Sequence, residues 1–326
     1  ISSVTGGVTA REAAELMLSR VFSATRMIRA WIYVNGGVFA VGWFTTFAHV
    51  SASAAGGSGL AAVLSTIVLY CCVYAAAAIN LCGRRRLKGS TARPIELLSI
   101  LPHPVGSACE RYLHERYLQV PIVERSMIGW LLSLVLRLFV FELAFDVFFY
   151  IAHYSVHAWP TVYSRVHKLH HRHTHDVWLL SSLQMTAADV LVTHTLPVLG
   201  ALTLIPMAGG LEISILKAYL LFQELYGHAG VEHKGRNFGP APWLSNALGI
   251  ELAAEDHVRH HIQANVNFSK RFSLCDKVFG TWAGTSCKNE DQQNRSTKGD
   301  AFPVSECERP ARLCNFERKN LQDKSK

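Results

Sequence analysis

Two long stretches of the chain carry no charged side chain, and this feature restricts the possible folds most. Residues 31–50 and 60–82 contain no Lys, Arg, Asp or Glu. Each has about the 20 residues that a helix needs to cross the hydrocarbon core of a bilayer. The segment between them is rich in Gly, Ala and Ser, so we expect a tight turn over 51–59. The pattern predicts a hairpin of two membrane-spanning helices and excludes a disordered chain.

Basic residues flank this hairpin on both outer ends. Arg26 and Arg29 precede the first stretch, and Arg84, Arg85 and Arg86 follow the second. Positive charge collects on the cytoplasmic side of membrane proteins, so both ends are expected in the cytosol. The net charge of +8 is then explained by an anionic membrane surface, and no nucleic-acid partner is expected.

Composition divides the chain into four parts. Residues 1–30 are predicted to form an amphipathic lead-in, 31–126 the hairpin and a basic cytosolic loop, 127–283 a histidine-rich domain, and 284–326 a polar tail. The histidine-rich domain contains further apolar runs. One covers 127–154, and two shorter runs within 188–226 are interrupted by Pro206, Gly209 and Gly210, which suggests a second hairpin.

Histidine is the unusual residue type, with 16 in the chain. Ten of them form one H-x-x-x-H pair, two H-x-x-H-H triplets and a pair five residues apart: His153, His157, His167, His170, His171, His228, His233, His257, His260 and His261. Residues at i, i+3 and i+4 share one face of a helix, so each triplet is predicted to present three imidazoles together. A zinc ion takes three or four protein ligands, so this number of donors predicts two metal ions. Imidazole binds Fe, Zn, Cu and Ni, so donor type does not name the metal.

The remaining polar residues of these segments have simpler explanations. We expect His49, His103, His114 and His194 to be hydrogen-bonded core residues, and His173 and His175 to be solvated. Asp146 lies two helical turns before His153 and has two interpretations. Together with Glu142 it could neutralise Arg137, or it could accept the N–H of a ligand histidine and orient that ring.

The histidine motifs resemble those of the fatty acid hydroxylase/sterol desaturase superfamily of integral membrane di-iron oxygenases. The resemblance rests on H-Y-S-V-H (153–157), H-K-L-H-H (167–171), H-A-G from His228 and H-V-R-H-H (257–261). The segment from His157 to Tyr163 and the D-K-V-F-G-T run at 276–281 are also similar. Two departures are visible: Tyr154 replaces an Arg common in the first motif, and the segment 184–189 lacks a His that sterol-type members often carry.

The resemblance implies an all-α membrane protein whose helical hairpins carry a cytosolic helical cap with a histidine-ligated dimetal site. It makes 127–283 the catalytic domain and the ten histidines of the four motifs the ligands of two iron ions. It also implies an O2-dependent oxidoreductase acting on a lipid from the bilayer, with electrons from a donor such as cytochrome b5 and its reductase. The expected location is the endoplasmic reticulum, with the active site facing the cytosol.

Several functions remain open at this stage. The D-K-V-F-G-T run favours a sterol or its isoprenoid precursor as substrate, with fatty acyl chains or carotenoids as the alternative. Hydroxylation, desaturation and epoxidation are not distinguished by histidine spacing. Outside this class, the alternatives are a membrane metal-binding or transport protein and an inactive lipid-binding scaffold. A zinc hydrolase is disfavoured because the sequence has no H-E-x-x-H motif.

Overall fold

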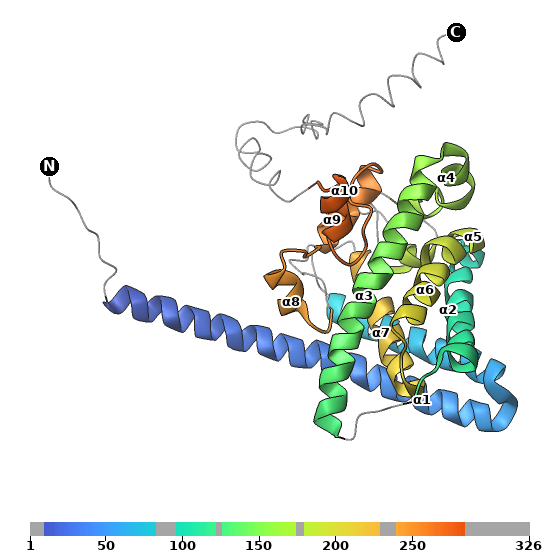
Figure 1. Cartoon of the computed structure of the whole chain (residues 1–326), viewed down its shortest axis with the longest axis horizontal. Coiled ribbons are helices and arrows are strands. Elements are labelled where there is room, and N and C mark those ends of the chain that lie inside the picture. Colours follow the sequence, from blue (N-terminus) through green and yellow to red (C-terminus); the bar gives the residue numbers. More distant parts are fainter. Residues whose placement is uncertain (1–9, 83–95, 122–125, 174–178, 229–238, 284–326) are drawn as a thin grey trace, which may run out of the picture.

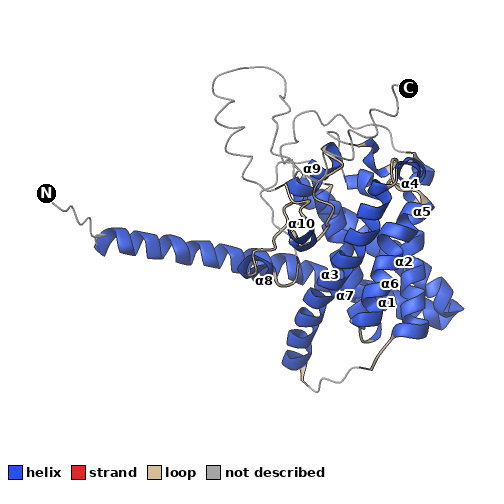
Figure 2. Ribbon diagram, turned by 45° about the horizontal axis from the view of Figure 1, so that its top comes forward, coloured by secondary structure: helices blue, strands red, loops and turns tan. Residues whose placement is uncertain are grey.

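The computed structural model describes residues 10–82, 96–121, 126–173, 179–228 and 239–283, and these are built from helices and loops without a strand (Figure 2). This agrees with the predicted all-α class. The α-helices are α1 (Ala10–Leu81), α2 (Pro102–Leu113), α3 (Met127–Ala158), α4 (Pro160–Val166), α5 (Ala187–Asp189), α6 (Leu196–Leu204), α7 (Gly209–Gly227), α8 (Pro242–Ala247), α9 (Ala254–Ile262) and α10 (Leu274–Phe279). The 3-10 segments are η1 (Leu97–Ile100), η3 (His170–Arg172) and η4 (Leu179–Leu183), and the π-helical segments are η2 (His114–Leu118) and η5 (Val190–Thr195).

Helix α1 contains both charge-free stretches and reverses direction at Gly57 (Figure 1). The φ angle of Gly57 is 83°, in the left-handed region that glycine adopts without steric cost. The Nδ1 atom of His49 lies 3.3 Å from Oγ of Ser65, across the two arms. The predicted hairpin is therefore present. Its helix continues through most of the predicted turn, because a single glycine is enough for the reversal.

Helix α7 packs against helix α1. Most of its side chains are buried, including Ile213, Ile215 and Tyr219. Gly42 lets the two helices approach closely, because a Cβ atom there would lie 2.6 Å from Cγ1 of Ile215. The main core joins buried apolar residues of α1, α3, α6 and α7.

Helix α3 runs the length of the domain and connects this core to the C-terminal segments (Figure 1). It begins at the N-cap Ser126, whose hydroxyl accepts the N–H of Gly129. It ends before Trp159, which is extended and precedes Pro160, the first residue of α4. Helices α9 and α10 lie beside its C-terminal half. The last turns of α3 therefore bring His153 and His157 next to the residues of α9.

Two segments of the described chain are long and apolar enough to cross a membrane, by length and composition: Trp31–Leu81 and Ala187–Leu204. The predicted second hairpin is interrupted as expected, with α6 ending at Leu204 and α7 beginning at Gly209. Its second arm differs from the expectation, because α7 buries Glu212, Lys217 and Glu224. Helix α7 is therefore a buried helix that carries charged side chains into the interior of the protein.

Candidate metal centre

Nine of the ten histidines predicted as ligands meet at the junction of α3, the 167–171 segment, α7 and α9. They form two groups in which the donor nitrogens lie within 4.8 Å of one another. The five-histidine group contains His153, His157, His167, His171 and His260, and the four-histidine group contains His170, His228, His257 and His261. All are buried except His157, which is half-buried. His233 lies outside the described residues.

The two H-x-x-H-H triplets are divided between the groups in opposite ways. His167 and His171 enter the five-histidine group, while His170 enters the four-histidine group. On α9 the i, i+4 pair His257 and His261 enters the four-histidine group, and His260 enters the other. The predicted shared helix face is therefore absent at 167–171, whereas on the regular helix α9 the three histidines share one face but divide between the two groups. Residues 167–169 form a turn followed by the 3-10 segment η3, which directs His170 apart from its neighbours.

The distances within each group suit ligands of a common ion. In the four-histidine group, the Nε2 atoms of His228, His257 and His261 are mutually 3.2 Å apart. An imidazole nitrogen has a single in-plane direction for its proton or lone pair, so it cannot point at two neighbours at once. Three such atoms can instead share one ion at metal–nitrogen distances of about 2.0–2.1 Å.

In four rings, the hydrogen bond made by Nδ1, the nitrogen that faces away from the cluster, determines which ring nitrogen carries the proton. The Nδ1 atom lies 2.7 Å from the carbonyl oxygen of Phe268 in His153, 2.8 Å from Oδ1 of Asp189 in His167, 2.9 Å from the carbonyl oxygen of Glu224 in His228 and 2.8 Å from that of Val266 in His260. These oxygens only accept hydrogen bonds, so each Nδ1 carries the proton. The neutral rings therefore present an unprotonated Nε2 to the cluster.

This assignment makes the cluster a cation site. The Nε2 atoms of His153 and His167 lie 3.0 Å apart, and neither has a proton to donate to the other. Two facing lone pairs at this distance repel unless a cation lies between or beside them. The donor set of neutral imidazoles fits a transition metal such as iron, zinc or copper.

Protonation of a histidine would not supply the missing positive charge at neutral pH, because the pKa values of these rings are low. Burial lowers the pKa of His260 to about 3. Burial and the neighbouring histidines also hold the pKa values of His170, His257 and His261 well below the usual range. The rings are thus neutral near pH 7 and ready to bind a metal without losing a proton first.

Asp146 has a different role from either predicted one. Its carboxylate accepts the backbone N–H groups of Lys270, Arg271 and Phe272 at 2.8, 2.8 and 3.1 Å. Arg137 is instead neutralised by Glu212, through two bonds of 2.7 and 2.6 Å. The sequence could not reveal these partners, because they lie 75 to 126 positions away along the chain.

The remaining histidines also occupy defined positions. His49, His103 and His114 are buried and bonded to Ser65, Tyr70 and the carbonyl oxygen of Met207, as predicted for core residues. His194 is buried against the ring of His103. The solvated position predicted for His173 was wrong, because it is 1% exposed and hydrogen-bonded to Gln184. His175 lies outside the described residues.

Asp189 is the site residue that sequence reasoning missed. It is fully buried, accepts the Nδ1 proton of His167, and follows the N-cap Thr186 on the short helix α5. The available signal in the sequence was a single acidic residue near the start of an apolar run.

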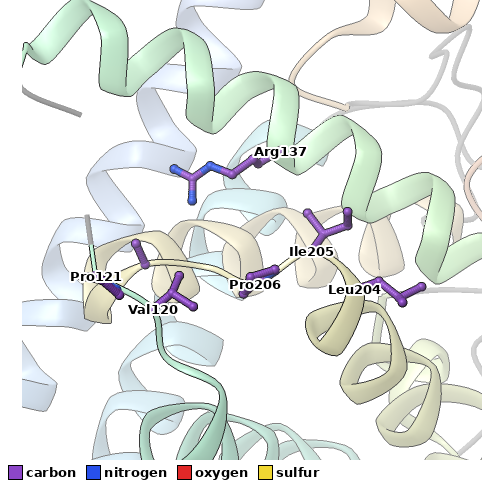
Figure 3. Close-up of a pocket in the computed structure, with 7 residues that line it drawn as sticks. Val120, Pro121, Arg137, Leu204, Ile205 and Pro206 are labelled. Carbon is purple, nitrogen blue, oxygen red and sulfur yellow. The ribbon is translucent and has the colours of Figure 1, made fainter. Parts of the chain in front are cut away.

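A separate pocket lies away from the histidines, between α3 and the loop that joins α6 to α7 (Figure 3). Its volume is about 310 Å³, and it is lined by Val120, Pro121, Arg137, Leu204, Ile205, Pro206 and Ala208. At 1.5 Å per residue, Arg137 lies about 24 Å from His153 along α3. The pocket is therefore not the site of chemistry on the cluster.

Comparison with known proteins agrees with the histidine motifs. A "Fatty acid hydroxylase vlmA" from Lecanicillium sp is 26% identical over 191 residues, which are 56% of this chain and 52% of that protein. A "Cholesterol 25-hydroxylase-like protein 1, member 2" from Danio rerio is 29% identical over 151 residues, 43% of this chain and 48% of that protein. The chain thus spans about half the length of these curated relatives. No solved structure matches it.

The family comparison covers the histidine-rich part of the chain. The fatty acid hydroxylase family matches residues 138–281, which include all nine histidines of the two groups. The match begins within α3 and ends at Thr281, the end of the D-K-V-F-G-T run. Residues 138–281 of this chain are therefore similar to the fatty acid hydroxylase family, in agreement with the resemblance of the histidine motifs.

Proposed function

We propose that this protein is a membrane-bound di-iron oxygenase that uses O2 to hydroxylate a lipid. The observation that carries the proposal is the pair of adjoining histidine groups, with nine donors in total. The rings of His171 and His261, one from each group, are 4.7 Å apart between centroids, so two ions would lie side by side. The similarity of residues 138–281 to the fatty acid hydroxylase family, and the names of the two relatives, support an oxidoreductase that acts on lipids.

Imidazole ligands bind several transition metals, and iron is the metal that the resemblance to the fatty acid hydroxylase family implies. The five- and four-histidine groups would each hold one ion, and the iron pair would supply reductive activation of O2. The protein residues hold the rings neutral and aligned, and their burial keeps water from the centre. Insertion of one oxygen atom into a C–H bond consumes O2, two electrons and two protons and releases water. An external donor such as cytochrome b5 with its reductase would supply the electrons.

A sterol is the substrate class that we propose. The relative from Danio rerio carries a cholesterol hydroxylase-like name, which supports this choice. The D-K-V-F-G-T run, which suggested a sterol from sequence, has a structural task instead, because Asp276 accepts two backbone N–H groups near the cluster. A fatty acyl chain is the second candidate, supported by the name of the Lecanicillium relative.

The apolar helices and the family indicate a membrane protein. We place it in the endoplasmic reticulum with the histidine groups on the cytosolic side, because the basic segments that flank the α1 hairpin favour that orientation. A metal transporter would expose its ligands along a pathway, whereas these ligands are enclosed in the fold. A resident cofactor therefore explains the cluster better than a transported ion.

Lipid analysis of a host that expresses the whole protein tests this function. We expect a hydroxylated sterol in cells with the wild-type chain and none in cells with His260→Ala. Hydroxylated fatty acids in place of sterols would favour the second substrate class. Iron analysis of the purified protein should give close to two ions per chain. Zinc in place of iron, or no metal together with unchanged lipids, would refute the oxygenase.

A further inference from the structure

The loop between α9 and α10 has an unusually complete set of backbone hydrogen bonds. We call residues 266–273 the support loop. Each N–H from Asn267 to Ser273 has an acceptor. The carbonyl oxygens of Thr281 and Ile250 accept the first and last of these seven groups. The five in between are accepted by side chains, so the conformation of the loop depends on specific residues elsewhere.

Two buried carboxylates accept all five of those N–H groups. Asp276 of α10 accepts from Phe268 at 2.8 Å and from Ser269 at 2.9 Å. Asp146 of α3 accepts from the next three residues, at 2.8 to 3.1 Å. Both carboxylates are at most 2% exposed, so their hydrogen bonds to the loop are shielded from competing water. Asn267 has a φ angle of 53°, a strained conformation that these bonds maintain.

The carbonyl groups of the same loop hold two histidines of the cluster. The oxygen of Phe268 accepts the Nδ1 proton of His153, and the oxygen of Val266 accepts that of His260. Both rings belong to the five-histidine group. Asp146 and His153 lie two turns apart on α3, so the loop is attached to this helix at both positions. In the four-histidine group, the Nδ1 proton of His228 goes to its own helix, at Glu224.

We propose that Asp146 and Asp276 are positioning residues for one metal ion of the pair, acting through the support loop. They fix the loop, and the loop carbonyls fix the rings of His153 and His260. Loss of either carboxylate should therefore weaken binding at the five-histidine group and leave the four-histidine group intact. This inference rests on the proposed two-metal function, but it makes a separate claim about which ion depends on these residues.

The test is anaerobic titration of the purified, metal-free, full-length protein with Co²⁺, followed by visible absorption. Variants His153→Ala and His257→Ala identify the signals of the five- and four-histidine groups. Asp146→Asn and Asp276→Asn keep the side-chain size but place an amide where a backbone N–H needs an acceptor. We expect each to weaken Co²⁺ binding at the five-histidine group on the order of 10-fold, with less than a 2-fold change at the other group.

A matched control separates positioning from general loss of stability. Leu134→Ala creates a cavity in the core at the far end of α3 and should lower the thermal midpoint without favouring either group. Equal weakening of both groups, or unchanged affinities, in Asp146→Asn and Asp276→Asn variants that remain helical by circular dichroism would overturn the inference. If the wild-type protein binds fewer than two Co²⁺ ions, the proposed function fails first.

Discussion

The two histidine groups differ in how the rest of the protein holds them. In the five-histidine group, three rings donate their Nδ1 protons to residues of other segments: Phe268, Asp189 and Val266. In the four-histidine group, His228 donates to its own helix, and within the described residues no acceptor is present for Nδ1 of His170, His257 or His261. Other segments therefore orient three of the five rings in one group, where His157 and His171 each have a ring nitrogen without a hydrogen-bond partner among the described residues, and none of the four rings in the other group.

Removing one ligand from each group tests whether both are needed. We expect His153→Ala and His257→Ala each to reduce bound iron toward one ion per chain. Lipid hydroxylation should fall by more than about 100-fold, which corresponds to the loss of about 2.7 kcal/mol of transition-state stabilisation. Metal analysis and product quantification measure the two effects. Wild-type turnover in His257→Ala would show that the four-histidine group is not part of the reaction.

Substitution of Asp189 should have the next largest effect on metal affinity, confined to the five-histidine group. Asp189→Asn removes the negative charge that accepts the Nδ1 proton of His167, so affinity of the five-histidine group should fall about 10–100-fold. Thr193→Val is the matched control. It removes the other side-chain donor to the same carboxylate oxygen, at 3.0 Å, and leaves the His167 bond in place. Equal effects of the two substitutions on Co²⁺ titration would contradict a specific role for the carboxylate.

Acid should destabilise the metal-free protein through both groups. Burial lowers the pKa of folded His260 to about 3, whereas an unfolded histidine has its ordinary pKa near 6.5. Between these values the unfolded chain binds more protons, so stability is lost as the pH falls below about 6.5. The expected loss is up to about 1.4 kcal/mol per pH unit for each such histidine.

Thermal unfolding of the metal-free protein at pH 7 and pH 5 measures this loss. The midpoint should be lower at pH 5, and both His260→Gln and His257→Gln should reduce the difference. A midpoint that does not change with pH would show that the rings are not held neutral by the fold. A reduction in only one of the two variants would identify the group that resists protonation.

We expect a substitution in the helical bundle to leave the metal affinities of both histidine groups at their wild-type values. Gly42→Ala places a methyl group 2.6 Å from Ile215 and should cost about 1–3 kcal/mol of stability. Thermal unfolding reports that cost, and Co²⁺ titration should give wild-type affinities at both groups. Altered affinity at either group would mean that the α1–α7 packing determines ring positions as well.

The sequence was informative where the signal was local. The absence of charge over 31–50 and 60–82 predicted the α1 hairpin, and spacing selected the nine histidines that the structure brings together. The turn was less well predicted, since small residues over 51–59 suggest a loop while helix continues up to Gly57. Local composition identifies a possible reversal, but it does not determine at which glycine the reversal occurs.

The features that escaped prediction depend on distant contacts or on local geometry. The support loop has no distinctive composition, and its contacts with Asp146 span 124 to 126 positions of sequence. The division of each triplet could not be foreseen either, because H-x-x-H-H at 167–171 has the same spacing as on α9 but is not a regular helix. Identical spacing therefore describes two different local structures.

The division of each triplet between two groups has a consequence for the distance between the ions. His257, His260 and His261 lie within little more than one turn of α9, yet they serve both groups. A helical turn is among the least deformable units of a protein, because its pitch is set by backbone hydrogen bonds. In the proposed two-metal centre, helix α9 would therefore set the separation of the two ions, so a movement of α9 would shift both ions together.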